Sequence, residues 1–335
     1  MNVGVLAVAG PGRSAETARR LEALGLHTVL FPDSQNLAPE VWGQLMVAAK
    51  ATTRIHLGPG VTNSITRDPA VTASAALALQ VESGGRAVLG IGRGDSSVQR
   101  IGKREDPVAT FERYLTAVQA YLRGEAVDRD GFASRLEWLE HTDVPKVPVE
   151  VAATGRRVVE VAARRADAVC LAVGADPQYV ASVLERVRDA ARAAGRTLRC
   201  GAFVNAVIHD DVPVARDAVR GSAASFARFS AFRGSDLTRL PAPLAAAARW
   251  LREHYDMRQH TRTGVPHTAG ISDEFVDWFA IAGPVEVARE RFRRLAALGL
   301  DFCYVIPGSA GMPREVAVES LARLGQDVVP ALAGG

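Results

Sequence analysis

The amino-acid sequence predicts a (β/α)8 TIM barrel, a closed ring of parallel strands surrounded by helices, with an inserted segment near its C-terminal half. Apolar runs of strand length alternate with helical patterns, and the strands are apolar on both faces, as in parallel sheets covered by helices. Segments 19–32 and 293–307 repeat one pattern, in which a helix ends at a glycine, Gly25 or Gly299, and an apolar strand follows. Similar units at both ends of the chain favour closure.

Each strand and helix is predicted from its local pattern. Strands are expected at 3–8, 28–31, 55–61, 87–91, 147–152, 168–172, 198–208 and 302–306. Helices are expected at 15–24, 39–51, 69–82, 111–122, 156–165, 177–193 and 284–298. A doubly wound dinucleotide-binding sheet is the alternative, but its GxGxxG pattern should follow the first strand. The chain has only Gly10-Pro-Gly12 there.

Two stretches are too long for a single crossover helix. Residues 123–147 and 210–281 are therefore predicted as insertions within one domain that spans 1–335. The longer insertion has helical patterns at 214–232 and 244–255 around loops at Gly234 and Gly264. Insertions at the carboxyl ends of barrel strands shape the substrate pocket. We expect this one to wall the pocket with Trp250, His254, Tyr255, His260 and Trp278.

Composition excludes several classes of function. With 40 basic and 37 acidic residues interspersed along the chain, the net charge is +3 and no basic stripe for nucleic acid is present. No apolar run approaches the about 18 residues that span a bilayer, and the start of the chain is not a signal peptide, so a cytoplasmic protein is expected. Cys170, Cys200 and Cys303 lie in or beside apolar runs and are predicted as buried thiols. The histidines have no metal-ligand spacing, so no metal site is predicted.

The fourth strand has the most informative ending. Leu89 and Ile91 alternate with Gly90 and Gly92, and glycine weakens a strand unless something approaches its backbone closely. Gly94 and Asp95 follow at the carboxyl end, where barrel enzymes keep their chemistry. A simple turn with Asp95 as a helix N-cap is the structural alternative.

Two other strand ends carry similar signals. Gly58-Pro-Gly60-Val61-Thr-Asn63 ends the third strand and suits a bulge that presses backbone against a flat ligand, although Gly-Pro-Gly also punctuates ordinary turns. Thr154-Gly155-Arg156-Arg157 follows the fifth strand and enters a helix, whose free N–H groups suit a phosphate. Plain helix capping by Thr154 is the alternative.

Taken in order, these motifs resemble the luciferase-like monooxygenase superfamily, in its branch of coenzyme F420-dependent oxidoreductases similar to methylenetetrahydromethanopterin reductase. The resemblance covers nearly the whole chain. It rests on Phe31-Pro-Asp33, on the Gly58 to Asn63 segment with Arg67-Asp-Pro69, on Gly85 to Asp95, on Ala152-Ala-Thr154-Gly155 and on Phe279-Ala-Ile-Ala-Gly283-Pro284.

The resemblance implies a deazaflavin or flavin at the carboxyl end of the barrel and a homodimer. It implies a non-prolyl cis peptide at Gly60-Val61, against the back of the ring, with Asp33 and Asn63 contacting the cofactor. It places Arg93, Gly94 and Asp95 along the ring, with Asp95 near the reacting carbon, and Thr154, Gly155 and Arg156 at the phosphate. Relatives that oxidise sugar phosphates have His after the aspartate of the second strand. This chain has Ser34 there, which disfavours alcohol oxidation.

The implied function is hydride transfer from reduced F420 to a C=N or C=C bond of a small-molecule, peptide or biosynthetic substrate, with Asp95 or a pocket water as proton donor. An FMN-dependent luciferase-like monooxygenase is the nearest alternative, because the two rings have similar shapes. A non-catalytic flavin-binding barrel is the alternative of another class. The bare glycine-lined strand ends argue against it.

Overall fold

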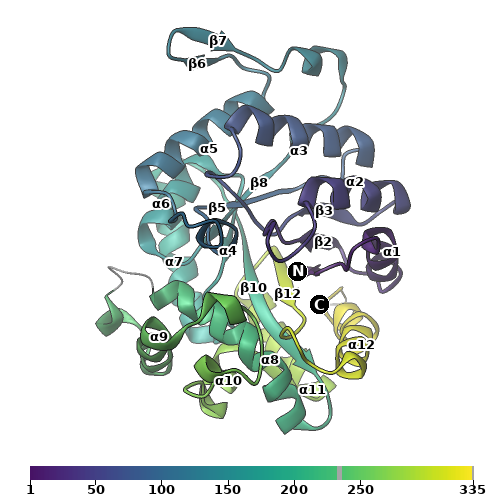
Figure 1. Ribbon diagram of the computed structural model, residues 1–335, viewed down its shortest axis with the longest axis vertical. Coiled ribbons are helices and arrows are strands. Elements are labelled where there is room, and N and C mark those ends of the chain that lie inside the picture. The colour runs from purple at the N-terminus through teal and green to yellow at the C-terminus, as the bar shows by residue number, and fades with distance from the viewer. Residues whose placement is uncertain (232–235, 334–335) are drawn as a thin grey trace.

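The strands of the protein form a barrel enclosed by helices (Figure 1), seen in a computed structural model that describes residues 1–231 and 236–333. Within these residues, ten strands form one sheet in the order β3-β2-β1-β12-β10-β9-β8-β5-β4, with β11 beside β10. A parallel bridge from Leu57 to Ala87 joins the β3 side of this sheet to the segment that leads into β5. The bridge brings the two edges together, and the predicted barrel is confirmed.

The strands lie close to their predicted positions. The second and last predicted strands have the expected boundaries, whereas the third is divided into two short strands by the Gly60-Val61 peptide, which is cis as the resemblance implies. The barrel strands are β1 Asn2–Leu6, β2 Thr28–Phe31, β3 His56–Pro59, β4 Thr62–Asn63, β5 Leu89–Gly92, β8 Val149–Ala153, β9 Ala168–Leu171, β10 Arg199–Ile208 and β12 Phe302–Ile306.

The seven predicted helices are present in the ring, and α12 and α13, after the last strand, were not predicted. Two of them start at Pro69 and Pro177, where the side chains of Asp68 and Asp176 accept backbone N–H groups at 2.9 and 2.8 Å, because proline suits the first helical position behind a capping residue. The helices are α1 Ser14–Ala23, α2 Val41–Ala51, α3 Pro69–Ser83, α5 Val108–Leu122, α6 Arg156–Arg165, α7 Pro177–Ala193, α11 Val285–Ala297, α12 Arg314–Arg323 and α13 Val329–Ala333.

The repeated units at the two ends of the chain were expected to be neighbours, but their strands are separated by β1. β1 lies between β12 and β2 in the sheet, and β2 and β12 are the strands of the two repeats. The glycines that end the preceding helices, Gly25 and Gly299, have φ values of +75° and +80°. Glycine adopts this left-handed conformation without a Cβ penalty.

Both predicted insertions carry structure of their own. The shorter one forms a hairpin of β6 Val127–Arg129 and β7 Phe132–Ser134, which projects from the helical ring (Figure 1). This hairpin was not predicted, although Asp130-Gly131 between its strands, with φ values of 54° and 88°, is typical of a two-residue hairpin turn. In the longer insertion, Phe232 and Gly234 lie outside the described residues, and Gly264 lies in the loop between η4 and η5. Its elements are α8 Val212–Ala227, η2 Arg228–Ala231, η3 Leu237–Arg239, α9 Ala242–His254, η4 Met257–Gln259, η5 Pro266–Thr268, α10 Asp273–Phe279 and β11 Ile281–Gly283.

The barrel interior is mostly apolar but contains one buried acid. Glu150, on β8, is 3% exposed and accepts a hydrogen bond of 2.7 Å from the hydroxyl of Tyr304 on β12. Burial raises the pKa of Glu150 to about 7, and the bond from Tyr304 opposes this only in part. The three cysteines are also buried, as predicted.

We expect Glu150→Gln to change how stability depends on pH. Because the folded-state pKa of about 7 lies above the ordinary value of 4.5, the folded protein holds more protons than the unfolded chain between these two values. Stability from this group is therefore present below pH 4.5 and is lost as pH rises towards 7, by about 3 kcal/mol. Urea unfolding from pH 5 to 8 should show Glu150→Gln gaining stability relative to wild type as pH rises. A constant difference would contradict the assignment.

Candidate functional site

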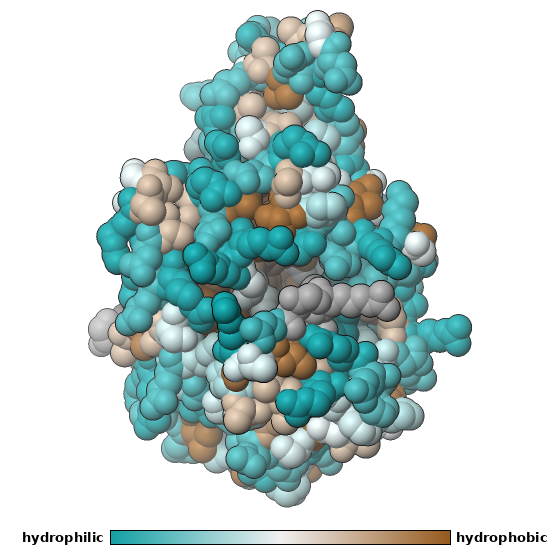
Figure 2. Space-filling model, turned by 90° about the vertical axis from the view of Figure 1, so that its left-hand side faces the viewer, coloured by the Kyte–Doolittle hydropathy of each residue, from teal (hydrophilic) through white to brown (hydrophobic). Residues whose placement is uncertain are grey.

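The carboxyl ends of the strands surround an apolar floor. A cluster of buried side chains fills the barrel and includes Leu30, Cys170, Phe203 and Tyr304. Five partly exposed side chains pack on this cluster from strand ends and from the longer insertion: Leu6, Val61, Ala152, Phe226 and Phe229. We call these five residues the floor. The face that forms the left-hand side of Figure 1 is mostly hydrophilic (Figure 2). Helix α4 (Ser96–Gln99) follows β5 at the carboxyl end of the barrel strands.

The glycines in β5 and just after β3 are needed for different physical reasons. A Cβ atom at Gly90 would lie 2.3 Å from the carbonyl oxygen of Pro59, and one at Gly60 would lie 2.5 Å from Cδ1 of Leu6. Both positions need glycine because protein atoms, not a ligand, occupy the space. Gly92 differs, since its Cβ would lie 3.3 Å from Val61 and 3.9 Å from Ala152. A side chain at Gly92 would therefore enter the floor itself.

Asp33 and Asn63 are buried and hold the loop after β4. Asp33 accepts hydrogen bonds from Thr62 Oγ1 at 2.7 Å and from Arg67 Nη1 at 2.5 Å. The side-chain oxygen Oδ1 of Asn63 accepts hydrogen bonds from two backbone N–H groups, those of residues 65 and 66, at 2.9 Å each. Its amide donates to Ser97 Oγ at 3.1 Å. These contacts fix the strand end, so both residues support the site from behind.

Asp95 lies beside the floor in an ion pair with Arg228 of η2, and their side chains are 20% and 9% exposed. The guanidinium also lies over the ring of Tyr255, 4.7 Å from its centroid, and over Phe229 of the floor, at 5.7 Å. The Asp95 side chain makes no capping hydrogen bond to α4. The capping alternative is therefore excluded. The pair instead ties the end of β5 to the insertion.

A second polar cluster lies behind this ion pair. The Tyr255 hydroxyl is 2.8 Å from Ser225 Oγ and 2.5 Å from Nδ1 of His260. Burial lowers the pKa of His260 to about 4, against the opposing effect of Asp95. His260 is therefore a neutral hydrogen-bond partner at physiological pH, and it holds Tyr255 under Arg228.

Arg93 and Gly94 shape the segment that leads to Asp95. Arg93 Nε donates to the backbone carbonyl of Asp106 at 2.6 Å. Gly94 has a φ of +103°, and a Cβ there would lie 2.5 Å from Val98. The structure thus gives both residues a structural role next to the site.

The N-terminus of α6 opens on the same end of the barrel. Its N-cap is Gly155, not Thr154, and no side chain caps it. The N–H groups of a helical first turn have no partner within the helix, and a Cβ at Gly155 would meet nothing within 4 Å. Thr154 contacts the carbonyl of Ala172 at 3.4 Å. Capping by Thr154 is therefore excluded, and space for an anion remains.

The aromatic residues expected to wall the pocket are divided between two places. Tyr255 and His260 lie behind the ion pair, as described above. The ring of Trp250 stacks on that of His254, with ring centroids 3.6 Å apart, and its Nε1 donates to the backbone carbonyl of His267. The ring of Trp278 packs on that of Tyr179, with ring centroids 5.8 Å apart. Phe226 and Phe229, which belong to the floor, and Arg228, which lies beside it, hold the position expected for the tryptophans.

The described residues contain neither a metal-binding cluster nor a membrane-spanning helix. Within residues 1–231 and 236–333, no group of three or more His, Cys, Asp or Glu side chains is placed to hold a metal ion. Over the same ranges, the structure contains no helix long and apolar enough to cross a membrane.

Comparison with known proteins agrees with this architecture. The family model described as luciferase-like monooxygenase matches residues 3–301. The chain belongs to the luciferase-like monooxygenase family. The matched residues include the ends of β4, β5 and β8.

Several curated relatives of this family member are reductases. The 5,10-methylenetetrahydromethanopterin reductase of Archaeoglobus fulgidus is 29% identical over 87% of each chain. The enzyme of the same name from Methanolobus tindarius is 32% identical, over 54% of this chain and only 56% of its own length. A phthiodiolone/phenolphthiodiolone dimycocerosates ketoreductase of Mycobacterium kansasii is 30% identical over 87% of this chain and 83% of that protein.

A solved structure supports the fold. The coenzyme F420 dependent tetrahydromethanopterin reductase of Methanopyrus kandleri superposes with a TM-score of 0.73 and 21% identity, over 99% of both chains.

Proposed function

We propose that this oxidoreductase uses coenzyme F420 and transfers hydride from the reduced cofactor to an electrophilic double bond of a small-molecule, peptide or biosynthetic substrate. The observation that carries the proposal is the floor, an apolar surface bounded by an uncapped helix N-terminus and by the Asp95–Arg228 ion pair. The names of the reductases from Archaeoglobus fulgidus and Methanopyrus kandleri agree with it.

The residues present fit a deazaflavin. A flat ring suits Val61 and Ala152, which are partly exposed, with Gly92 leaving the space between them open. The first turn of α6, at Gly155 and Arg156, suits the phosphate because helix N-termini bind anions. Gly60, Asp33, Asn63, Arg93 and Gly94 would act by holding these surfaces in place.

When bound, reduced F420 supplies a hydride at C5 of its ring. The floor would exclude water from one side and fix the orientation of the ring. Arg228 would offer positive charge where a substrate gains electron density, an electrostatic effect that needs a preorganised cation. An ion pair needs Asp95 as a carboxylate, so we assign to Asp95 the role of positioning Arg228. We assign proton delivery to a water molecule at the carboxyl end of the barrel.

The bond reduced is proposed as C=N or C=C. The ketoreductase from Mycobacterium kansasii acts, by its name, on ketones. A C=O bond therefore belongs in any substrate panel.

We also propose a homodimer. Three exposed valines lie on the outer faces of α2 and α3: Val47, Val71 and Val81 are 53%, 55% and 39% exposed. Exposed apolar side chains on two adjacent helices offer surface that a partner can cover. A second copy of the chain is the partner we expect.

The test compares cofactors directly. Purified protein is titrated with F420 and with FMN, and ring absorbance and fluorescence are followed. We expect F420 to bind at least tenfold more tightly, and reduced F420 to be consumed with a compound from a panel of imines, alkenes and ketones. Tighter FMN binding would favour the family's monooxygenase activity, and binding without turnover on any compound would favour a non-catalytic barrel. Either result would overturn the proposal.

A further inference from the structure

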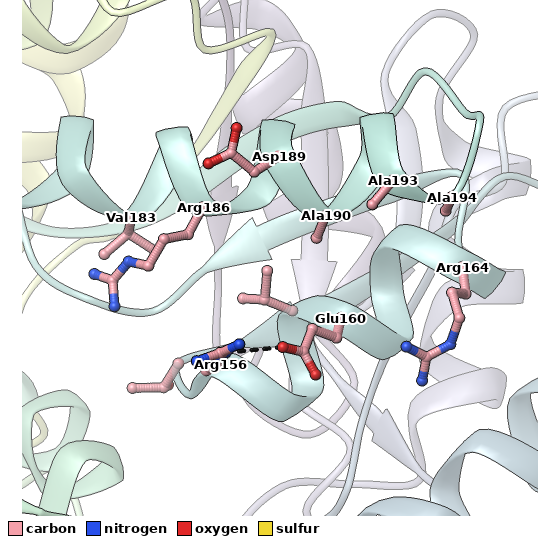
Figure 3. Close-up of a pocket in the computed structure, with 11 residues that line it drawn as sticks. Arg156, Glu160, Arg164, Val183, Arg186, Asp189, Ala190, Ala193 and Ala194 are labelled. Carbon is pink, nitrogen blue, oxygen red and sulfur yellow. Dashed lines mark hydrogen bonds and ion pairs between the residues drawn. The ribbon is translucent and has the colours of Figure 1, made fainter.

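A groove runs between α6 and α7 and begins at the helix N-terminus proposed for the phosphate. Its volume is about 570 Å³, and Thr154 and Arg156 line it together with residues as far along α6 as Arg164. Figure 3 shows the two helices side by side, with Arg156 and Arg186 near one end and Arg164 near the other. The groove therefore continues away from the barrel mouth along the outside of the ring.

The charges along this groove favour an anion. Three arginines line it, and Arg156 pairs with Glu160 at 2.9 Å. Asp189 points away from α6 (Figure 3) and pairs with Arg192 instead. Arg164 pairs with Glu112 at 2.9 Å, and Arg186 donates to the carbonyl of Ser182 at 3.1 Å.

Apolar side chains lie between the arginines. Val159 and Val183 are buried and line the groove, with Ala190, Ala193 and Ala194 further along α7. Methylene groups of a chain that carries charged ends pack well on such a surface. The groove thus alternates cationic and apolar contacts along the length of α6.

We propose that this groove binds the carboxylate-bearing tail of the cofactor. The inference rests on the proposed function, because F420 continues beyond its phosphate as a lactyl chain with linked glutamates, whereas FMN ends at the phosphate. A groove that starts at the position proposed for the phosphate and carries arginines along α6 and α7 suits the longer molecule. The tail would also compete with Glu160 for Arg156, so Glu160 tunes its affinity.

The test measures dissociation constants for F420 with several glutamates and for the form that ends at the phospholactyl group. Wild type should bind the glutamate form about tenfold more tightly at low salt, and this preference should shrink in about 0.5 M salt, because exposed charge pairs are screened. Arg156→Ala and Arg186→Ala should each weaken binding of the glutamate form by about threefold, the scale of an exposed ion pair. The tail-free form should change by less than twofold with Arg186→Ala.

Two further variants sharpen the result. Glu160→Gln should tighten binding of the glutamate form only, because it releases Arg156. Arg294→Ala is the matched control, since Arg294 makes the same i,i+4 pair with Glu290, at 2.8 Å, on α11. It should change neither constant. Equal affinity of wild type for the two forms would show that the groove does not bind the tail, while leaving the proposed function intact. Failure to bind either form would overturn the proposed function and the groove with it.

Discussion

Arg228→Met is expected to lower the free energy of unfolding by about 3 kcal/mol, near the lower limit for breaking a buried ion pair. The side chains of Arg228 and Asp95 are 9% and 20% exposed, so removal of the cation leaves a largely buried carboxylate without its partner. The loss should include the contact with the Tyr255 ring, which lies 4.7 Å from the guanidinium. Urea unfolding with an unchanged slope would measure the effect.

The partner variant separates charge from packing. Asp95→Asn keeps the shape of the side chain and removes its charge, and the double variant Arg228→Met with Asp95→Asn should cost less than the sum of the two single changes. A shortfall of about 1–3 kcal/mol is typical of residues in direct contact. Losses that simply add would show that the pair does not couple β5 to the insertion.

The same pair should affect turnover more than cofactor affinity. Asp95→Asn leaves the floor and the N-terminus of α6 untouched, so F420 should bind within about twofold of wild type, while loss of the oriented cation should slow hydride transfer by about 100-fold or more. Unchanged turnover would remove Asp95 from the mechanism.

The sequence predicted the barrel well because its signals are local and repeated. Helix caps such as Asp68 and Asp176 and two-sided apolar strands depend on neighbours in the chain, so periodicity alone locates them. The hairpin of β6 and β7 was missed because its strands have only three residues each and are largely exposed. Such strands carry no apolar pattern to detect.

The site was predicted less completely, for a physical reason. The strand-end motifs singled out Val61, Asp95 and Gly155, which the barrel geometry brings to one end. Phe226 and Phe229 are three residues apart on a helical pattern, and this spacing is equally typical of core packing. Only the fold shows that they reach the barrel cluster and that Arg228 between them reaches Asp95. Contacts between residues 133 positions apart leave no local trace.

A Gly92→Val substitution tests the central claim, that the cofactor ring lies on the floor. The new side chain would start 3.3 Å from Val61 and 3.9 Å from Ala152, in the space assigned to the ring. Ala152→Leu fills the same space from β8 without changing a glycine, so one variant remains informative if the other folds poorly. Gly43→Val is the control, because Gly43 is exposed on α2 and a Cβ there would meet only the Glu40 carboxylate, at 3.5 Å.

The decisive measurement is F420 affinity of folded Gly92→Val and Ala152→Leu protein, compared with wild type and Gly43→Val. Because the new side chains occupy the space assigned to the ring, we expect affinity to fall by about 100-fold, equivalent to about 2.8 kcal/mol. Gly43→Val should bind like wild type. If both floor variants fold and bind F420 as tightly as wild type, the ring does not lie on the floor.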